Sequence, residues 1–347
     1  LDFDFSCIEL LCEYFFNNGV VFQNAIMLLN IRYFVVSKRY LIIVTLLFLL
    51  ISSLRAQYDP EFSHYFDMEP SFNPGSVGKE SKLNIETAYA LDFAGFKDNP
   101  RTMYVGADMP FYALKNYHGI GVNIINDEIG LFTHKRFAIQ YAYKHKLFKG
   151  ILSVGIQGNL ISEGFDGSKV DLENTGDPAF ATSNVTGSGM DVALGIYYIH
   201  RFWYIGLSGQ HLTSPTITLG TTNRLKIDAN YYLTGGYNIK LRNPFVTIQP
   251  SVLIRTDGSD YRADITGRLV YTHENKIFYG GVTYSPTNSV TFLLGGNFHG
   301  IMIGYSYEMY TSTINIGNGS HELYVGYQTD INLVKKGRNV HKSVRIL

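Results

Sequence analysis

Carboxylate oxygens gather in one part of this sequence, between residues 162 and 188. The group includes Asp166, Asp171, Glu173 and Asp177, and oxygen ligands of this kind are the ones that Ca²⁺ prefers. Their spacing, however, does not match the loop of an EF-hand. We therefore interpret this stretch as a hydrated loop and keep a calcium site as the alternative.

The other groups capable of chemistry form no enzyme motif. The ten histidines are scattered, and none occurs in H-E-x-x-H or in a Cys/His cluster with zinc spacing. Gly119-Ile120-Gly121 lacks the third glycine of a dinucleotide fingerprint, and no Walker A run is present. Gly187-Ser188-Gly189 lacks the spacing of a nucleophile elbow, and Ser208 has no candidate base nearby. We predict that the protein is not an enzyme and carries no cofactor or metal centre.

Composition excludes further classes of protein. Charged residues make up 17% of the chain, below the usual share, while aromatic residues reach 14% and glycines number 34. The formal net charge is +0 at pH 7, so no basic field is present to hold nucleic acid phosphates. Both cysteines, Cys7 and Cys12, lie near the start of the chain. A mature chain that begins after residue 56 therefore contains neither disulfides nor thiolate metal sites.

From Lys82 onward, apolar and polar residues alternate with a period of two, which is the pattern of half-buried strands. In the clearest case Val246 and Ile248 share one face, while Thr247 and Gln249 share the other. Most of these segments are about as long as the ~9–11 residues that a tilted strand needs to cross a bilayer. The fourteen segments are 81–91, 101–109, 117–126, 135–145, 150–161, 189–199, 202–212, 225–237, 244–255, 260–272, 276–285, 289–298, 300–310 and 320–331.

Two features favour a membrane barrel over a soluble β-sandwich, which alternates in the same way. Short connections such as 146–149 are interleaved with longer ones such as 162–188, as in barrels with short periplasmic turns and longer external loops. Aromatic residues such as Phe202-Trp203 lie near segment ends, where interfacial girdles form. We predict an all-β fold, a transmembrane antiparallel up-and-down β-barrel of about 14 strands over residues 81–331.

Charged residues on the polar faces of these strands are expected to point into the barrel. On the lipid side each charge would cost ~2–4 kcal/mol at mid-depth, whereas ion pairs in the lumen would brace or line the interior. The candidates for lumen-facing charge are Lys226, Asp228, Arg255, Arg262, Asp264 and Arg268.

The first 56 residues have the features of an export signal preceded by an extension. Basic residues precede an apolar run over 40–51, and Ala56 follows a short polar stretch. A positive start, an apolar core of ~7–15 residues and a small residue before the cleavage site make up a secretory signal peptide. We predict that 1–26 is upstream sequence and that 27–56 is the signal peptide; a membrane anchor is the alternative.

Two segments fall outside the strand pattern. Residues 57–80 contain three prolines, which exclude a long helix or a central strand. Residues 332–347 are basic and contain no Asp or Glu. An even number of strands returns the chain to the side on which it started. We expect both termini in the periplasm, with the tail either a solvated end or a docking peptide.

Several short motifs at the two ends of the chain and between them are distinctive. They are Asp59 to Tyr65, Asn73-Pro74-Gly75, Ala107 to Pro110, His118 to Gly121, Tyr232 to Tyr237, Ser320 to Tyr327, Lys335 to Asn339 and His341 to Arg345. Together they resemble the PorP/SprF family over essentially all of 57–347. The chain departs from that pattern at Gly75 to Gly78, where an Ala-Tyr-Ala-Gly-like run is expected.

The resemblance implies an outer-membrane component of the type IX secretion system of a Gram-negative bacterium. That system exports proteins with a C-terminal sorting domain and, in gliding bacteria, surface adhesins. The implied partners are outer-membrane lipids, periplasmic ring proteins and cargo sorting domains. A diffusion porin or small-solute uptake barrel is the alternative function. The residues expected to dock partners are Asp59, Pro60, Phe62, Tyr65, Asn73, Pro74, Lys335, Lys336, Arg338, His341, Lys342 and Arg345.

Overall fold

The structure is a computed structural model, and its described residues belong to one compact unit, Arg55–Leu347. Within it the described residues are 58–169, 184–220, 223–274, 276–286, 288–311 and 318–331. The upstream extension, the signal peptide and the basic tail 332–347 lie outside these residues, so their assignments stay predictions. None of the helices among the described residues has the length and apolar character needed to span a membrane.

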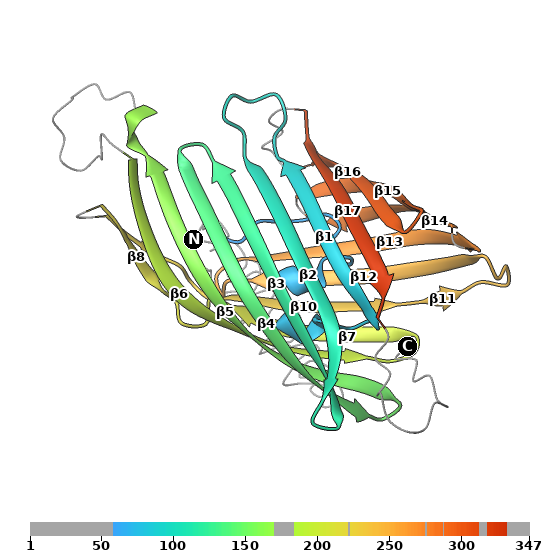
Figure 1. The fold of residues 1–347 in the computed structure, drawn as a ribbon. Coiled ribbons are helices and arrows are strands. Elements are labelled where there is room, and N and C mark those ends of the chain that lie inside the picture. Colours follow the sequence, from blue (N-terminus) through green and yellow to red (C-terminus); the bar gives the residue numbers. More distant parts are fainter. Residues whose placement is uncertain are drawn as a thin grey trace, which may run out of the picture. The chain divides into compact units, whose positions relative to one another are not determined.

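Fourteen antiparallel strands close into a barrel, which confirms the predicted fold class (Figure 1). Each strand of the ring pairs with the strand that follows it, and β1 pairs with β17 to close the ring. The pairing of β7 with β10 passes over a separate two-stranded hairpin. The short β11 continues β10 after Asn238, and both pair with β12. The ring consists of β1 Lys82–Leu91, β2 Arg101–Ala113, β3 Asn116–Ile129, β4 Phe132–Leu147, β5 Gly150–Asp166, β6 Asn184–Ile199, β7 Trp203–Gln210, β10 Asn230–Tyr237 with β11 Ile239–Lys240, β12 Val246–Thr256, β13 Tyr261–His273, β14 Lys276–Ser285, β15 Ser289–Phe298, β16 Ile301–Tyr310 and β17 Ser320–Asp330.

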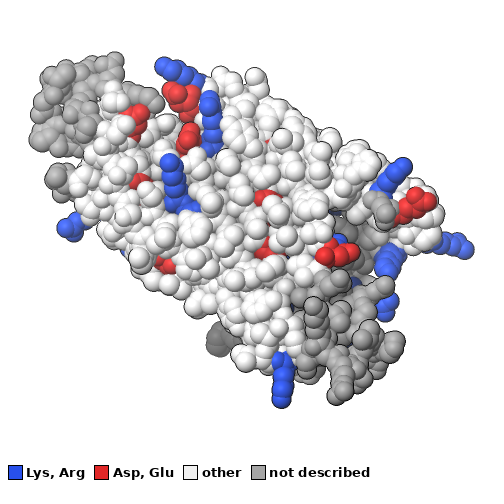
Figure 2. All heavy atoms as spheres, in the orientation of Figure 1, with Lys and Arg blue, Asp and Glu red and all other residues white. Residues whose placement is uncertain are grey.

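The wall is apolar outside and polar inside because successive strand side chains point to opposite faces. On β4, Phe137, Ile139 and Tyr141 are exposed on the outer surface, while Arg136 and Gln140 are buried toward the lumen. Figure 2 shows an outer face largely free of charged side chains, with most of the protruding ones near its ends. A closed ring pairs its backbone groups from strand to strand, as a spanning sheet in hydrocarbon must.

The two ends of the barrel differ in their connections. The short-turn end carries turns such as 114–115, 148–149 and 200–202. The long-loop end carries longer connections such as 92–100 and 211–229. The chain leaves the last strand, β17, at the short-turn end, where Lys82 pairs with Asp330. The alternation of connection lengths expected from the sequence is only partial, because the connections 130–131, 257–260 and 286–288 at the long-loop end are also short.

One predicted strand, 225–237, is wrong in its first part. Strand β9 (Asn223–Lys226) pairs with β8 (Thr216–Leu219) in a separate hairpin, and the barrel strand begins only at Asn230. The Ile227 side chain of this connection packs with Ile161 and Ile217. A two-stranded hairpin alternates in the same way as a barrel strand, so periodicity could not separate the two.

The position of residues 58–81, which we call the plug, also differs from the expectation of a segment in the periplasm. Tyr58 hydrogen-bonds His134 and Glu163 at the long-loop end, and the segment ends beside Lys82 at the short-turn end. Its two single-turn helices, η1 (Glu69–Ser71) and η2 (Pro74–Ser76), are buried. The plug therefore runs along the inside of the barrel, so its prolines mark an irregular lumenal segment.

Ile139 lies halfway along β4 on the outer surface, so Ile139→Arg would place a charge at mid-depth of the membrane. We expect this change to destabilise the folded barrel by ~2–4 kcal/mol. Ile301→Arg, at the outward-facing first position of β16, is the matched control and should cost only ~0–1 kcal/mol. Denaturant unfolding of protein refolded into phospholipid vesicles measures both. Equal small effects at the two positions would contradict a hydrocarbon environment around the wall.

Candidate functional site

The interior of the barrel is the largest concentration of buried polar groups in the described part of the chain. His64, Met68 and Asn73 of the plug have relative exposures of 0%. The plug has little regular structure, so its backbone and side-chain polar groups need partners from the wall. The site is therefore the contact surface between the plug and the inward-facing side chains.

One ionic layer surrounds Glu61 of the plug. Its Oε1 lies 2.8 Å from Arg255 Nη2, and its other oxygen contacts Arg262. Arg262 also pairs with Asp264, at 2.9 Å, and with Glu308, at 3.0 Å. Arg255 and Asp264 are joined at 3.1 Å. Three of the predicted lumen-facing charges thus meet, and the two arginines among them share Glu61, an acid that the sequence did not single out.

Arg268, the fourth predicted lumen charge on these strands, contacts an aromatic ring and a carboxylate of the plug. Its guanidinium carbon lies 3.4 Å from the centroid of the Phe66 ring. Its Nη1 lies 3.7 Å from Asp67 Oδ1. A cation over an aromatic face in a desolvated site contributes about 2 kcal/mol. Arg268 therefore fixes the middle of the plug to β13.

The remaining two candidates for lumenal charge lie elsewhere. Lys226 is the last residue of the hairpin strand β9, and its Nζ pairs with Asp228 Oδ1 at 2.6 Å. Both side chains are largely exposed. The assignment of Lys226 to a barrel strand was therefore wrong, because the local alternation belongs to the hairpin.

Asp59 is a second ionic centre, near the long-loop end. Its Oδ1 lies 3.0 Å from His211 Nε2, and its Oδ2 accepts hydrogen bonds from Tyr232, at 2.6 Å, and Asn230, at 2.9 Å. Arg136 approaches at 3.5 Å. Burial acts to raise the pKa of the Asp59 carboxyl, but His211 and Arg136 hold it well below its usual range. The carboxylate is therefore ionised.

His211 lies between two carboxylates. Its Nδ1 is 2.9 Å from Asp191 Oδ2 on β6, opposite the contact to Asp59. Burial alone would lower the pKa of the His211 imidazole, but Asp59 and Asp191 raise it to about 9. The imidazolium therefore links the plug to the wall at neutral pH.

The helical turns of the plug are held mainly through their carbonyl groups. Gln140 donates to the Pro70 carbonyl at 2.6 Å, and Arg136 donates to that of Ser71 at 2.8 Å. Ser208 and Gln210 on β7 both donate to the Phe72 carbonyl at 2.8 Å. These inward-facing polar groups replace the water that an irregular backbone would otherwise need.

Wall glycines let η2 lie directly against the sheet. A Cβ at Gly155 would come within 2.3 Å of the Pro74 carbonyl oxygen, and one at Gly195 within 2.1 Å of Asn73 Oδ1. Asn73 uses that same oxygen to accept from Gly75 N at 2.8 Å, which caps η2. Any larger residue at either wall position would push the plug inward.

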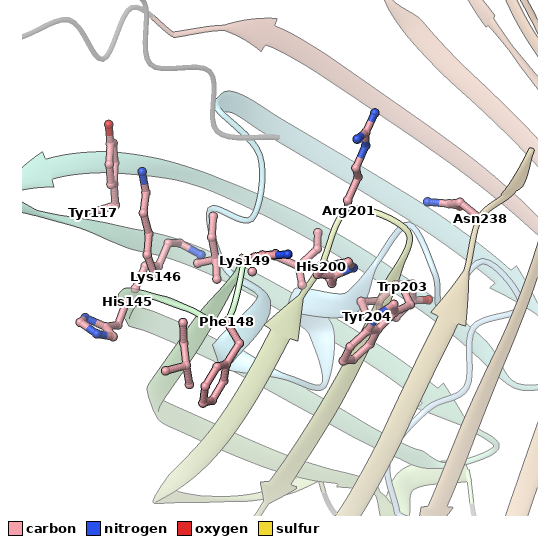
Figure 3. A pocket seen from close by; sticks show the side chains of 15 residues that line it. Tyr117, His145, Lys146, Phe148, Lys149, His200, Arg201, Trp203, Tyr204 and Asn238 are labelled. Carbon is pink, nitrogen blue, oxygen red and sulfur yellow. The ribbon is translucent and has the colours of Figure 1, made fainter.

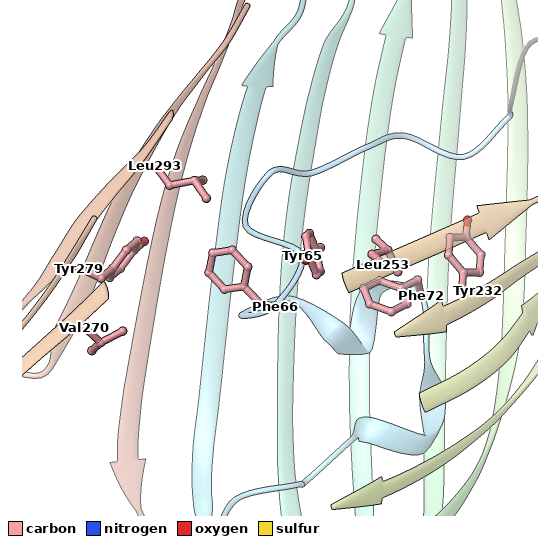
Figure 4. Close-up of a cluster of buried hydrophobic side chains, with 8 residues drawn as sticks. All are labelled: Tyr65, Phe66, Phe72, Tyr232, Leu253, Val270, Tyr279 and Leu293. Carbon is pink, nitrogen blue, oxygen red and sulfur yellow. The ribbon is translucent and has the colours of Figure 1, made fainter. Parts of the chain in front are cut away.

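Apolar side chains fill the space on the other side of the plug. Tyr65, Phe66 and Phe72 of the plug form one buried cluster with wall side chains (Figure 4). The wall contributes Tyr232, Leu253, Val270, Tyr279 and Leu293. The void left between plug and wall here is only about 20 Å³, space for roughly one water molecule.

His64 ties the plug to the last strand. Its Nδ1 lies 2.6 Å from Glu322 Oε1 on β17, and the backbone N–H groups of Ser63 and His64 also donate to this carboxylate. The start of the plug is thus held by a strand from the other end of the barrel sequence.

The docking candidates in this segment face the inside of the barrel wall. Asp59, Tyr65, Asn73 and Pro74 are buried, while Pro60 and Phe62 are half-buried. Their expected role at a periplasmic surface conflicts with this position, because their side chains contact the wall. The remaining candidates, Lys335, Lys336, Arg338, His341, Lys342 and Arg345, lie outside the described residues.

Of the acidic loop, the structure describes the two ends. Asp166 Oδ1 accepts from the Ser168 hydroxyl at 2.5 Å and from its N–H at 3.2 Å, an ordinary turn. Asp171, Glu173 and Asp177 lie outside the described residues. Over the parts of the chain that the structure describes, no group of three or more His, Cys, Asp or Glu is placed to hold a metal ion.

The family model for the type IX secretion system membrane protein PorP/SprF matches residues 54–327. No curated protein matches. Among solved structures, the CymD monoaromatic hydrocarbon channel aligns with 80% of this chain and 95% of its own, at 10% identity and a TM-score of 0.46. Omp33 of Acinetobacter baumannii aligns over 73% and 100%, at 6% identity and a TM-score of 0.41. A Pseudomonas aeruginosa FadL homologue aligns over 72% and 89%, at 9% identity and a TM-score of 0.40.

Because of the His211 contacts, the stability of the start of the plug should depend on pH. Because folding raises the pKa from 6.5 to about 9, the imidazolium contributes stability in full below pH ~6.5. That contribution is lost as the pH rises through about 9. Amide hydrogen exchange at residues 58–62 should therefore accelerate at alkaline pH, beyond its intrinsic pH dependence.

In His211→Asn this alkaline loosening should be absent, and the segment should already be less protected at neutral pH. His299→Asn, in a turn at the short-turn end, is the matched control and should behave like the unmodified chain. An identical exchange profile in His211→Asn and the control would contradict the assigned role of His211.

Proposed function

The chain belongs to the PorP/SprF family of type IX secretion system membrane proteins, and on this premise we propose that it is a closed anchoring barrel of the outer membrane. It engages periplasmic ring proteins, cargo sorting domains or both during protein secretion or the display of surface adhesins. This role is non-enzymatic: the barrel positions proteins and does not transform a substrate.

The plug is the observation that carries this proposal. Its side chains or backbone groups hydrogen-bond to strands around most of the ring, which are β2, β3, β4, β6, β7, β10, β12, β13 and β17. A lumen crossed in this way leaves little room for a solute. The ends of the barrel are then the surfaces left for proteins.

Connection lengths support one orientation. Short turns face the periplasm in outer-membrane barrels, and longer loops face the cell exterior. On that rule the chain leaves β17 on the periplasmic side, whereas Tyr58 lies toward the exterior, within the barrel. A periplasmic location of the C-terminal tail is consistent with this orientation and stays part of the proposal.

The alternative is a diffusion porin or small-solute uptake barrel. It was motivated by the charged strand faces, but Arg255, Arg262 and Arg268 are used in contacts with the plug. The alternative therefore requires that the plug move out of the lumen.

Conductance in planar bilayers separates these functions. We expect the purified barrel to be electrically silent, because plug and wall fill the lumen. Glu61→Ala/Asp67→Ala removes two acids that pair with wall arginines and should give ion-conducting openings. Glu80→Ala, an exposed acid of the same segment, is the matched control and should stay silent. Stable open channels from the unmodified barrel would contradict the closed state.

Deletion of 334–347 tests the role of the tail. The last strand ends at Asp330, so the barrel should still assemble, with the heat-modifiable gel mobility typical of a folded barrel. We expect loss of co-purification with periplasmic ring proteins and reduced secretion of cargo that carries a sorting domain. Unchanged secretion and ring association in a correctly assembled deletion variant would remove the tail from the docking role.

A further inference from the structure

A basic cavity of about 540 Å³ opens at the short-turn end, outside the contacts that hold the plug (Figure 3). It lies among the β4–β5 turn, the β6–β7 turn and the start of β3. Its basic lining residues are Lys144, His145, Lys146, Lys149, His200 and Arg201. No Asp or Glu is among the described residues that line it.

Lys144 is the buried member of this group. Its side chain has a relative exposure of 6%, and its Nζ contacts only the Ser153 hydroxyl, at 3.2 Å. No carboxylate of the described residues lies within ion-pair distance of it. Asp108 acts on this ammonium electrostatically without forming an ion pair, so an incoming carboxylate would give the buried charge its first direct acidic partner.

The cavity belongs to the mouth of the lumen and not to the lipid-facing wall. Lys144 occupies an inward-facing position of β4, and Tyr204 occupies one of β7. Tyr204 stacks on Tyr197, whose hydroxyl donates to Glu69 of the plug at 2.9 Å. A ligand in this cavity would therefore arrive from the aqueous side and lie next to the plug.

The rim of the cavity is preorganised. The Tyr198 hydroxyl lies 3.0 Å from the Leu147 carbonyl oxygen and 3.1 Å from that of Phe148, which fixes the β4–β5 turn. A Cβ at Gly150 would come within 2.5 Å of that hydroxyl, so this approach requires glycine. A fixed rim lowers the entropic cost of binding.

The same rim carries an exposed apolar side chain. Phe148 is 85% exposed and lies at φ 44°, a left-handed conformation that non-glycine residues adopt only rarely. The neighbouring turn repeats the arrangement with Leu114, which is 88% exposed. Lys115 and Lys149 follow these two residues directly. Apolar tips beside a set of cations match a protein surface better than an inorganic ion.

We propose that this cavity is a docking site for an acidic, aromatic-containing segment of a periplasmic partner protein. Carboxylates of the segment pair with the lysines and Arg201, while its apolar residue packs against Phe148. The basic tail of this chain is excluded as the occupant, because Lys335, Lys336 and Arg338 carry the same charge as the cavity. The assignment of the partner to the periplasm rests on the proposed function and orientation.

Binding of a defined probe tests this proposal. The full chain is placed in phosphatidylcholine nanodiscs, and fluorescence anisotropy measures a labelled peptide of alternating Asp and Phe. We expect saturable binding that weakens as salt increases, and no binding of the peptide with Asn in place of Asp. Lys149→Glu and Arg201→Glu should each weaken binding by about tenfold, the effect of losing one charge-assisted contact.

Lys276→Glu is the matched control, since it reverses a charge at the same end of the barrel outside the cavity. If Lys276→Glu weakened peptide binding equally, the proposal would be overturned, since the peptide would then be attracted by the overall positive charge at this end of the barrel. Loss of peptide binding in nanodiscs that contain phosphatidylglycerol would overturn it in favour of a lipid headgroup. Displacement by millimolar inorganic phosphate would assign the cavity to a small anion and would also overturn it.

The conductance of the same variants separates this proposal from the proposed function. Lys149→Glu and Arg201→Glu leave every plug contact in place, so both should remain electrically silent. Silent barrels that do not bind the peptide would refute the docking site alone. Open channels in the unmodified chain would refute the closed barrel and leave the peptide measurement intact.

Discussion

The structure depends on satisfying an irregular backbone inside a closed sheet. The wall strands pair with one another, whereas the plug has no ladder partner and only two single-turn helices. Its carbonyl groups are therefore met by side chains such as Gln140, Ser208 and Gln210. This requirement explains why so many inward positions of the barrel are polar but not solvated.

The ionic contacts determine where the plug lies more than how stable the protein is. Replacing a whole buried ion pair by apolar groups is often neutral, but removing one partner costs about 3–5 kcal/mol because a buried charge is left alone. Glu61 among its arginines and Asp59 beside His211 each penalise any other position of the segment. With Arg268 over Phe66, these contacts hold the plug against β10, β12 and β13.

Much of the wall could be predicted from sequence. A strand with one apolar face shows an alternation of apolar and polar residues that can be recognised without knowing what the strand packs against. The hairpin at Lys226 could not be separated from a barrel strand, since its alternation has the same period. The prolines of 57–80 excluded regular structure but did not tell where an irregular segment would lie. The useful signal was electrostatic: Arg255, Arg262 and Arg268 outnumber Asp264 on adjacent strands, and the acids that compensate them lie in 57–80.

The central claim is that residues 58–79 are part of the folded interior when the protein is in its membrane. Amide hydrogen–deuterium exchange of the membrane-embedded chain, resolved to this segment by mass spectrometry, tests it most directly. Amides near Glu69 to Ser76 should exchange as slowly as those of the neighbouring strands β4 to β6. Exchange at the rate of an unstructured peptide, with the strands still protected, would contradict it.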